Sequence, residues 1–193
     1  MSTVTHDQLI SPEYQAQLDK MRDPQHMPRL GAGGQRHVPH VLAVISAHKV
    51  KSIVDYGCGH GKLMEEIAKT FPPHKLTLTG YDPGMPQFSA LPEPADMVIS
   101  TDVLEHVEPE KLDGVLTHIR FLTGKVAYLH IHTGPANAIL PDGRNAHLIQ
   151  KPAEWWQEKL AQYYTTVEPL RGSNGARKGS HIFGGYRPTF LCV

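Results

Sequence analysis

The sequence predicts an α/β domain with a mostly parallel sheet and helices on both faces of that sheet. The first observation is residues 52–62, where a short apolar run and Asp55 are followed by glycines at alternate positions and then by helical apolar spacing. The second is residues 76–82, another strand-like run, which ends in Asp82. A buried strand, a tight glycine turn, a helix and a second strand are the parts of a Rossmann-type βαβ unit.

The glycine turn and the acid after the second strand together predict a nucleoside site. Gly57, Gly59 and Gly61 permit positive φ and let a ligand approach the backbone where a Cβ would clash. The helix that starts at Lys62 offers unpaired N–H groups and a partial positive charge, which suit a polar or anionic ligand. Asp82 lies 21 positions after Gly61 (82 − 61 = 21), at a strand end, where an acid can bind a pair of ribose hydroxyls.

Two helices are predicted before the first strand. Residues 1–10 are expected to form an unpacked tail, and Ser11-Pro12 then opens a helix that ends before Asp23-Pro24. Residues 27–37 contain too much glycine for regular structure and are expected to form a linker or a loop. The second helix begins at Val38 and packs on the sheet.

The middle of the chain departs from a regular alternation of strands and helices. The helix after the glycine turn is expected to span residues 62–71 and to end at Pro72-Pro73. Only 14 positions separate Asp82 from Asp96 (96 − 82 = 14), and the four prolines between them disfavour a full crossover helix. We therefore expect this helix to be lost or reduced to a turn.

The later part of the chain returns to the alternation. Gly124 is expected to end the helix that Pro109 opens. Residues 133–147 are polar and turn-rich, and they are interpreted as a substrate loop at the sheet edge where ligands bind in open α/β folds. The remaining elements predicted from apolar spacing are strands at 96–101, 125–132, 165–170 and 181–190 and a helix at 152–163.

Three motifs resemble those of class I S-adenosylmethionine (SAM)-dependent methyltransferases. The glycine spacing is G-x-G-x-G after Asp55, and Asp82 follows at the second strand, as in the nucleoside-binding motif of that family. Residues 96–107 resemble the family's fourth strand and the loop after it. The resemblance covers about residues 50–130, and it implies a Rossmann-like sheet with an antiparallel hairpin at its C-terminal edge. It also implies SAM as cofactor and methyl transfer to an O or N atom.

The resemblance assigns cofactor-binding residues. In the family the glycine loop and the acid before it hold the methionine end of SAM, the second acid holds the ribose, and the fourth strand ends near the methyl group. The residues at these positions are Asp55, Gly57, Cys58, Gly59, Gly61, Asp82, Thr101 and Asp102. The acid that often contacts the adenine has no clear counterpart, so Met85, Phe88 or Leu91 is expected to sandwich the ring.

An N-terminal segment covers the SAM pocket in many members of the family. The resemblance therefore implies that residues 27–37 form such a cover, in which Arg29 or Arg36 meets a carboxylate. The sequence does not choose between these two arginines.

The catalytic candidates are Asp102, His106 and His147. Methyl transfer depends on alignment, and a base matters most when the acceptor atom must lose a proton. Histidine can act as a base near neutral pH. Glu105, His130 and His132 lie in the same predicted region and are further candidates, while the alternative interpretation of His106 is a hydrogen-bonded structural histidine.

A metal-dependent variant is an alternative interpretation, although the primary assignment names no metal ligand. Asp102, Glu105 and His106, followed later by His147, resemble the acid-x-x-Glu-His plus distant His set of metal-dependent 2′-O-methyltransferases that act on small-RNA 3′ ends. Carboxylates and imidazoles at this spacing can share a divalent ion. Asp102 stands where that set has Glu.

Two other classes of protein stay open. The reduced second crossover is compatible with a non-catalytic SAM-binding partner subunit. A nicotinamide oxidoreductase would need a pyrophosphate-spaced glycine set, and the sequence has none.

The composition narrows the class of methyl acceptor and the cellular compartment that we expect. Nineteen basic and nineteen acidic residues balance, which favours a small-molecule or nucleotide-type acceptor over long nucleic acid. Two cysteines make no disulfide framework, and no apolar run is long enough to span a bilayer, so we expect a cytoplasmic protein. We expect one domain, divided into N-terminal helices with the covering loop (1–48), a cofactor-binding core (49–132), and the substrate loop, helix and hairpin (133–193).

Overall fold

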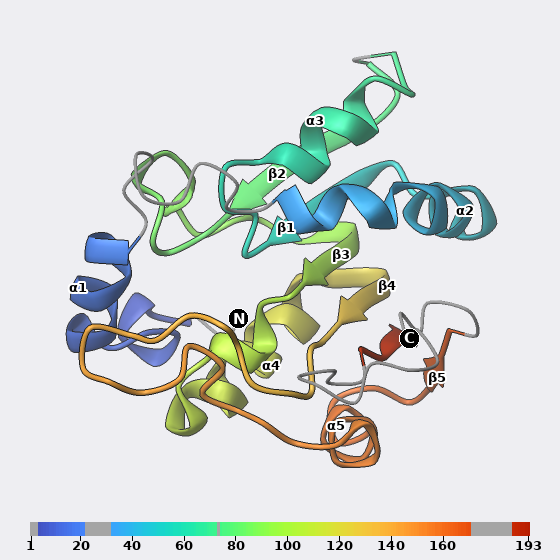
Figure 1. The fold of residues 1–193 in the computed structure, drawn as a ribbon. Coiled ribbons are helices and arrows are strands. Elements are labelled where there is room, and N and C mark those ends of the chain that lie inside the picture. The colour runs from blue at the N-terminus through green and yellow to red at the C-terminus, as the bar shows by residue number, and fades with distance from the viewer. Residues whose placement is uncertain (1–3, 22–31, 73, 171–186) are drawn as a thin grey trace.

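The computed structural model describes residues 4–21, 32–72, 74–170 and 187–193, and within them it forms one six-stranded sheet of order β2-β1-β3-β4-β6-β5 (Figure 1). Strands β2, β1, β3 and β4 pair in parallel, and β6 pairs antiparallel with both of its neighbours, β4 and β5. This confirms the predicted mostly parallel α/β fold with an antiparallel edge. The strands are β1 (Ser52–Tyr56), β2 (Thr77–Tyr81), β3 (Ala95–Thr101), β4 (Thr123–His130), β5 (Val167–Pro169) and β6 (Thr189–Cys192).

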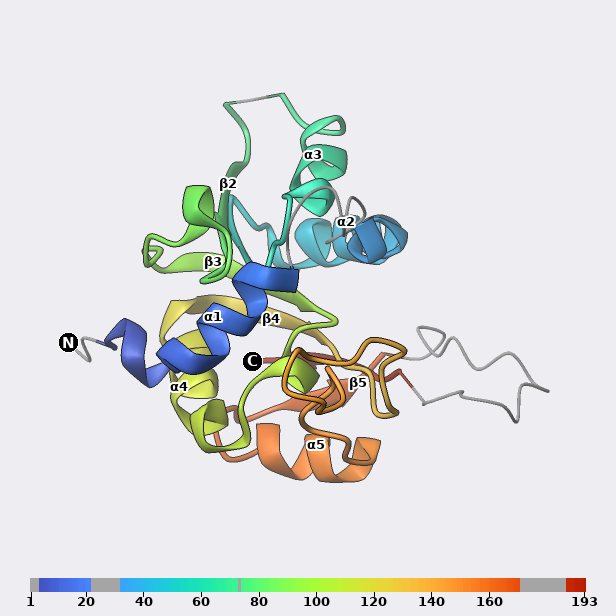
Figure 2. The same ribbon diagram turned by 60° about the vertical axis from the view of Figure 1, so that its left-hand side comes forward.

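Helices cover both faces of the sheet (Figure 2). Successive strand residues point to opposite faces, so Val98 packs in one cluster while Met97 and Ile99 pack in the other. Helices α4 (Leu112–Leu122) and α5 (Ala153–Leu160) line the first cluster, and α2 (Val38–His48) and α3 (Lys62–Ala68) line the second. In the described part of the chain, no helix combines the length and apolar character that crossing a bilayer requires.

The N-terminal region is more ordered than the sequence predicted. Helix α1 (Pro12–Met21) forms as expected, but the expectation of an unpacked tail is wrong for residues 4–10, which include the short 3-10 helix η1 (His6–Gln8). Leu9 and Ile10 are buried because they pack against the core below α1. These apolar residues fix the approach of α1 to the sheet.

The glycine-rich segment before α2 is also regular in part, contrary to prediction. Residues 32–37 form a 3-10 helix, η2 (Ala32–His37), while residues 27–31 lie outside the described part of the chain. A Cβ on Gly33 would come to 3.4 Å from Oδ2 of Asp102, and one on Gly34 to 3.2 Å from Oγ1 of Thr101. The glycines therefore permit close packing against the end of β3 rather than supplying flexibility.

Two predicted helix boundaries differ from the structure. Helix α3 ends at Ala68 instead of reaching residue 71. Gly124 does not end a helix but lies inside β4, where a Cβ would come to 2.9 Å from the carbonyl oxygen of Ala95 on the neighbouring strand. Its glycine is thus needed for strand-to-strand approach.

The predicted C-terminal strand is only partly testable. Of the range 181–190, residues 181–186 lie outside the described part of the chain, and β6 begins only at Thr189. Strand β6 lies between β4 and β5 and pairs antiparallel with both. The last strand in chain order is thereby an interior strand of the sheet.

The segment from Asp82 to β3 confirms the predicted loss of a crossover helix. Between residues 83 and 94, all of which are described, the only helical turn is η3 (Pro86–Phe88). The main-chain N–H of Asp82 donates to the carbonyl oxygen of Phe88 at 2.9 Å, which folds the segment back on the end of β2. This region is therefore a compact cap beside the glycine turn.

Candidate active site at the carboxyl ends of the strands

The sheet has a topological switch point at β1. Strand β1 pairs with β2 on one side and with β3 on the other. The chain therefore leaves the carboxyl ends of these strands in opposite directions, and such a crevice is where open α/β sheets bind ligands. The glycine turn follows β1, and Asp102, Glu105 and His106 follow β3.

The glycine turn has the conformation that its sequence predicts. Gly57, Gly59 and Gly61 have φ of 79°, 53° and 74°. A Cβ on Gly57 would come to 2.3 Å from Cγ2 of Val103, so a larger residue does not fit. The N–H groups of Gly57 and Cys58 both donate to the carbonyl oxygen of Tyr81, at 2.7 and 3.1 Å, which fastens the turn to the end of β2.

Asp82 organises the turn as well as ending β2. Its carboxylate is buried; Oδ2 accepts from the N–H of Gly59 at 3.0 Å and Oδ1 from the N–H of Gly84 at 2.9 Å. Sequence analysis predicted ribose binding at this position but not these contacts. The acid therefore links the glycine turn to the start of the shortened segment.

Asp55 is a buried carboxylate with an unsatisfied atom. Its side chain is 3% exposed, and within the described residues Oδ2 has no hydrogen-bond partner. Burial, and secondarily the charge of Asp82, raise the pKa of Asp55 to about 7. A cationic ligand group beside this oxygen would offset the cost of burying the charge, which fits the ammonium group of a SAM methionine end.

The side chains near the turn differ in their fit to the predicted adenine contacts. Met85 is buried, and the ring of Phe88 comes to 3.4 Å from a Cβ built on Gly61, so both lie beside the turn. Leu91 is 44% exposed. Cys58 is buried, and its sulfur lies 2.9 Å from a Cβ built on Gly80, which makes its side chain a packing group.

Asp102 is held by the N-terminal segment. Its backbone is left-handed, with φ of 54°, and its Oδ2 accepts from Nη2 of Arg36 at 2.6 Å. Arg36 is one of the two arginines that the resemblance offered for contact with a carboxylate; the other, Arg29, lies outside the described residues. Because η2 also lies against Thr101, this segment covers both predicted residues at the end of β3.

His130 serves packing rather than proton transfer. Its Nδ1 lies 2.8 Å from Oγ1 of Thr189, and its ring stacks on that of His37 with centroids 4.2 Å apart. Burial, and secondarily the Arg36 charge, lower the pKa of His130 to about 3, so it is neutral at physiological pH. His130 therefore joins β4 to β6 and to the N-terminal segment.

A second group of polar side chains gathers beside Asp102. Glu105, His106 and His147 each offer one potential ligand atom, and these atoms lie within 4.8 Å of one another. Glu105 and His106 belong to the 3-10 helix η4 (Leu104–His106) after β3, and His147 closes the loop after β4. The primary sequence assignment named no metal ligand, but the metal-dependent alternative named these three residues together with Asp102, and the fold brings the three together.

Glu105 is fully buried and incompletely bonded. Its Oε1 accepts from the N–H of His132 at 3.0 Å, and its Oε2 has no partner among the described residues. Burial, and secondarily the charge of Asp102, raise the pKa of Glu105 to about 8. A buried carboxylate and two imidazoles whose potential ligand atoms lie within 4.8 Å of one another are a donor set that a divalent cation fits.

Hydrogen bonds decide which ring nitrogen of His106 and His147 carries the hydrogen. A carbonyl oxygen only accepts, so the Nδ1 atoms of His106 and His147 carry hydrogens toward Ala146 (2.8 Å) and Gly134 (2.6 Å). Each of these rings keeps a lone pair on Nε2, as a metal ligand or base requires.

His132 has the opposite tautomer. Its Nδ1 accepts from the N–H of Gly134 at 3.0 Å, so Nε2 carries the hydrogen in the neutral ring. Burial is the main cause that lowers the pKa of His132 to about 4. His132 is therefore a hydrogen-bond donor, and this role is not apparent from the sequence.

A small cavity lies between the glycine turn and the loop after β3. It measures about 70 Å³ and lies between α1 and the carboxyl ends of the strands. Gly57 and Asp82 line it from the cofactor side, and Val103 and His106 line it from the loop after β3. Two of the predicted cofactor residues, Gly57 and Asp82, thus border the same space as one possible metal ligand, His106.

Comparison with protein families identifies the class. A family model described as a methyltransferase domain matches residues 31–169, most of the chain, so the chain belongs to this methyltransferase domain family. SAM is accordingly the cofactor. A search of the curated proteins finds no match to the chain.

Solved structures share the fold at low sequence identity. An O-methyltransferase family protein from Burkholderia thailandensis is 16% identical over 93% of this chain and 61% of its own length, with a TM-score of 0.62. The 1,6-didemethyltoxoflavin-N1-methyltransferase of the same organism, solved with S-adenosylhomocysteine, is 14% identical over 95% of this chain and 90% of its own (TM-score 0.61). The methyltransferase domain of bacterial CtHen1-C is 16% identical over 82% of this chain and 97% of its own (TM-score 0.58).

Proposed function

We propose that the chain is a SAM-dependent O-methyltransferase that binds its acceptor hydroxyl beside a divalent metal ion. The observation that carries this proposal is the grouping of Glu105, His106 and His147 within 4.8 Å next to the predicted methyl-transfer end. A hydroxyl must lose its proton to become a good nucleophile, so its transfer benefits most from such a group. This moves the metal-dependent alternative ahead of an unassisted N-methyltransferase.

The cofactor side holds and aligns SAM. Asp55 faces the ammonium group, Asp82 accepts from the ribose hydroxyls, and the glycines let the main chain approach the ligand. Support comes from the buried, unsatisfied Oδ2 of Asp55 and from the fixed carboxylate of Asp82. Alignment of the methyl group with the acceptor oxygen is the main task of these residues.

The acceptor side prepares the hydroxyl. His106 and His147 would hold a divalent ion through their Nε2 atoms, and the carboxylate of Glu105 would supply the negative charge. A divalent ion, when bound, lowers the pKa of a hydroxyl in contact with it and fixes its position. His132 donates from Nε2 to a second acceptor oxygen. Asp102 keeps its contact with Arg36 and closes the site from the N-terminal side.

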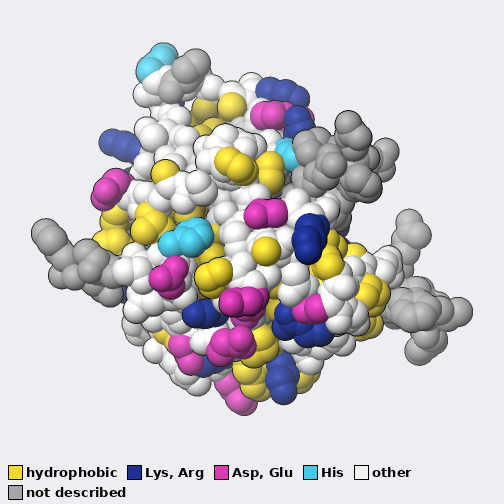
Figure 3. Space-filling view, turned by 90° about the vertical axis from the view of Figure 1, so that its left-hand side faces the viewer, with side chains coloured by type: hydrophobic (Ala, Val, Ile, Leu, Met, Phe, Trp, Pro, Cys, Tyr) yellow, Lys and Arg dark blue, Asp and Glu magenta, His cyan; other side chains and the backbone are white. Residues whose placement is uncertain are grey.

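The acceptor class we favour is a nucleotide-type or small molecule with neighbouring hydroxyls. Two oxygens on adjacent carbons can meet the ion and the donor of His132 together. The pattern from Asp102 to His147 resembles that of enzymes acting on RNA 3′ ends, where such a hydroxyl pair occurs. On the face around α1, basic and acidic side chains are intermixed, which suits an acceptor that presents one reactive end (Figure 3).

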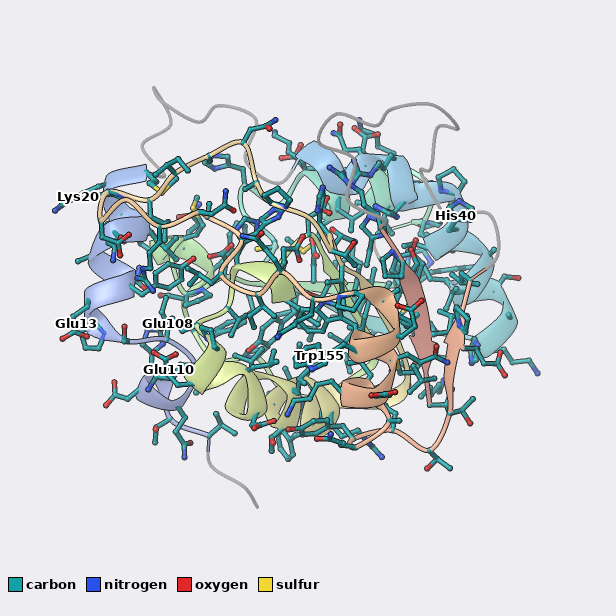
Figure 4. The ribbon with its side chains drawn as sticks, turned by 60° about the horizontal axis from the view of Figure 1, so that its bottom comes forward. Glu13, Lys20, His40, Glu108, Glu110 and Trp155 are labelled. Carbon is teal, nitrogen blue, oxygen red and sulfur yellow. The ribbon has the colours of Figure 1, made fainter. Side chains whose placement is uncertain are left out.

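The test is calorimetric titration with MnCl2 and, separately, with S-adenosylhomocysteine. We expect one Mn²⁺ per chain in the wild type and its loss in His147→Ala and Glu105→Gln, with S-adenosylhomocysteine affinity unchanged. His40→Ala is the matched control, because His40 is exposed on α2, across the molecule from α1 (Figure 4). Binding of S-adenosylhomocysteine without Mn²⁺, Mg²⁺ or Zn²⁺ binding would overturn the metal-dependent proposal.

An activity assay on the same protein preparation is the second test. Methyl transfer from SAM to a ribonucleoside or a short RNA should stop on chelation and return on addition of Mn²⁺. Equal rates with and without chelator would leave a methyltransferase but exclude the role we assign to Glu105.

A further inference from the structure

Helix α1 contacts the segment that carries two of the proposed ligands. The hydroxyl of Tyr14, a residue that is 4% exposed, donates to the main-chain oxygen of His106 at 2.8 Å. This hydrogen bond joins the first turn of α1 to the last residue of η4. It acts on the backbone that carries the His106 ring.

A second contact fixes the start of the same helix. The N–H and Oγ of Ser11 donate to the two carboxylate oxygens of Glu108, at 2.8 and 2.6 Å. Oγ of Ser11 also accepts from the N–H of Tyr14 at 3.1 Å. Glu108 is buried two residues after His106 and lies beside the start of α1, where a carboxylate is favoured (Figure 4).

The apolar side of α1 packs on the loop that carries the third ligand. Tyr14 forms a buried cluster with Leu140 and Ala146, and Leu18 packs against it. Ala146 directly precedes His147, and its carbonyl oxygen accepts from Nδ1 of His106. Figure 1 shows this loop, drawn in yellow-orange, running beside α1. One helix thus contacts both chain segments that supply the proposed ligands.

We propose that α1 is a brace for the metal site and that Tyr14 is a positioning residue for it. This inference rests on the proposed function. Metal–ligand distances tolerate shifts of only about 0.2 Å, so the segments bearing His106 and His147 must be held in register. The Tyr14 hydroxyl and Glu108 fix the first segment, and the apolar side of α1 fixes the second.

The test compares Mn²⁺ affinity in Tyr14→Phe and Tyr164→Phe, measured by calorimetry with the ion alone. Tyr164 is also 4% exposed, and its hydroxyl lies 3.3 Å from Oγ1 of Thr123, away from the site. Both changes remove one buried hydroxyl, so they control for general loss of stability. We expect Tyr14→Phe to weaken Mn²⁺ binding about threefold to tenfold and Tyr164→Phe to leave it unchanged.

A second variant tests the other anchor. Glu108→Gln removes one of the two acceptors that bind Ser11, and it should weaken Mn²⁺ binding in the same direction. Unchanged affinity in both Tyr14→Phe and Glu108→Gln would overturn the brace while leaving the metal site standing. Equal losses in Tyr14→Phe and Tyr164→Phe would show a stability effect and overturn it as well. Failure of the wild type itself to bind Mn²⁺ would remove the proposed metal site, and the brace with it.

Discussion

His132 and His147 hydrogen-bond to the same residue, Gly134, through opposite atoms. The carbonyl oxygen of Gly134 accepts from Nδ1 of His147, and its N–H donates to Nδ1 of His132. The two rings, with centroids 4.7 Å apart, therefore present a lone pair and an N–H side by side. Gly134 alone thus fixes the tautomers of both rings: His147 keeps a lone pair on Nε2 for a metal ion or a proton, and His132 keeps an N–H there for donation.

The tautomers can be observed directly in solution. Long-range ¹H–¹⁵N spectra at pH 7.5 should show His147 protonated at Nδ1 and His132 at Nε2, each as one fixed tautomer. His40 is exposed and provides an internal reference that averages between tautomers. A spectrum in which His147 carries its proton on Nε2 would contradict the assignment and remove this ring as a ligand.

The buried Asp55 predicts a pH dependence of stability. Its pKa is about 7 in the folded state, because of burial and the charge of Asp82, against 3.8 for the ordinary group. The unfolded chain therefore releases this proton at lower pH than the folded chain does. The contribution of Asp55 is fully present below about pH 4, is lost as pH rises to about 7, and amounts to roughly 4 kcal/mol.

Asp55→Asn isolates this contribution. The variant keeps the shape of the side chain but does not titrate. We expect urea unfolding to give similar free energies for wild type and variant near pH 4 and a more stable variant at pH 8. The difference between the two proteins cancels the contributions of the buried histidines. A difference that stays constant from pH 4 to pH 8 would show that Asp55 titrates normally.

Substitution of Asp82 should reduce cofactor affinity. Asp82→Asn keeps one acceptor for a main-chain N–H but removes the charge, and we expect S-adenosylhomocysteine to bind about tenfold to a hundredfold more weakly. Asp142→Asn is the control: Oδ1 of Asp142 accepts from the N–H of Arg144 at 2.9 Å in a similar local turn, on an exposed loop. Equal affinity for wild type and Asp82→Asn in calorimetry would refute the ribose assignment.

Substitutions at Gly57 and Gly143 distinguish the cost of backbone strain from the cost of steric conflict. Gly57 and Gly143 both have positive φ, 79° and 88°, but a Cβ on Gly57 would lie 2.3 Å from Cγ2 of Val103, whereas one on Gly143 has no atom within 4 Å. We expect Gly143→Ala to cost about 1 kcal/mol and Gly57→Ala about 3 kcal/mol in urea unfolding. Similar losses would mean that Val103 moves aside freely.

The parts of the site that are local in sequence could be predicted. The glycine turn, the acid after β2 and the missing crossover helix each depend on a few consecutive residues whose backbone preferences are strong. The fold class followed because apolar runs, turns and helical spacing all agreed. The sequence also predicted that Arg29 or Arg36 meets a carboxylate, and the fold shows Arg36 paired with Asp102, a partner that the sequence did not indicate.

The parts that depend on distant contacts could not be predicted. The spacing of Glu105, His106 and His147 does not itself show that two loops meet, since 41 positions separate the two histidines (147 − 106 = 41); only the resemblance to metal-dependent methyltransferases grouped them. Gly124 was predicted to end a helix, since glycine is common there. The sequence does not show that Ala95 on another strand approaches it closely. The N-terminal residues looked like a polar tail, although Leu9 and Ile10 are buried below α1.

The position of β6 has a consequence for how the protein is made. Residues 189–192 are synthesised after all the other strands, yet they lie between β4 and β5, and Thr189 contacts His130. Until these residues have left the ribosome, β4 presents an open edge to other chains, and β5 has no neighbour to pair with. We expect the nascent chain to be most prone to aggregation in the interval after β5 has emerged and before β6 has paired, because the sheet is then still divided.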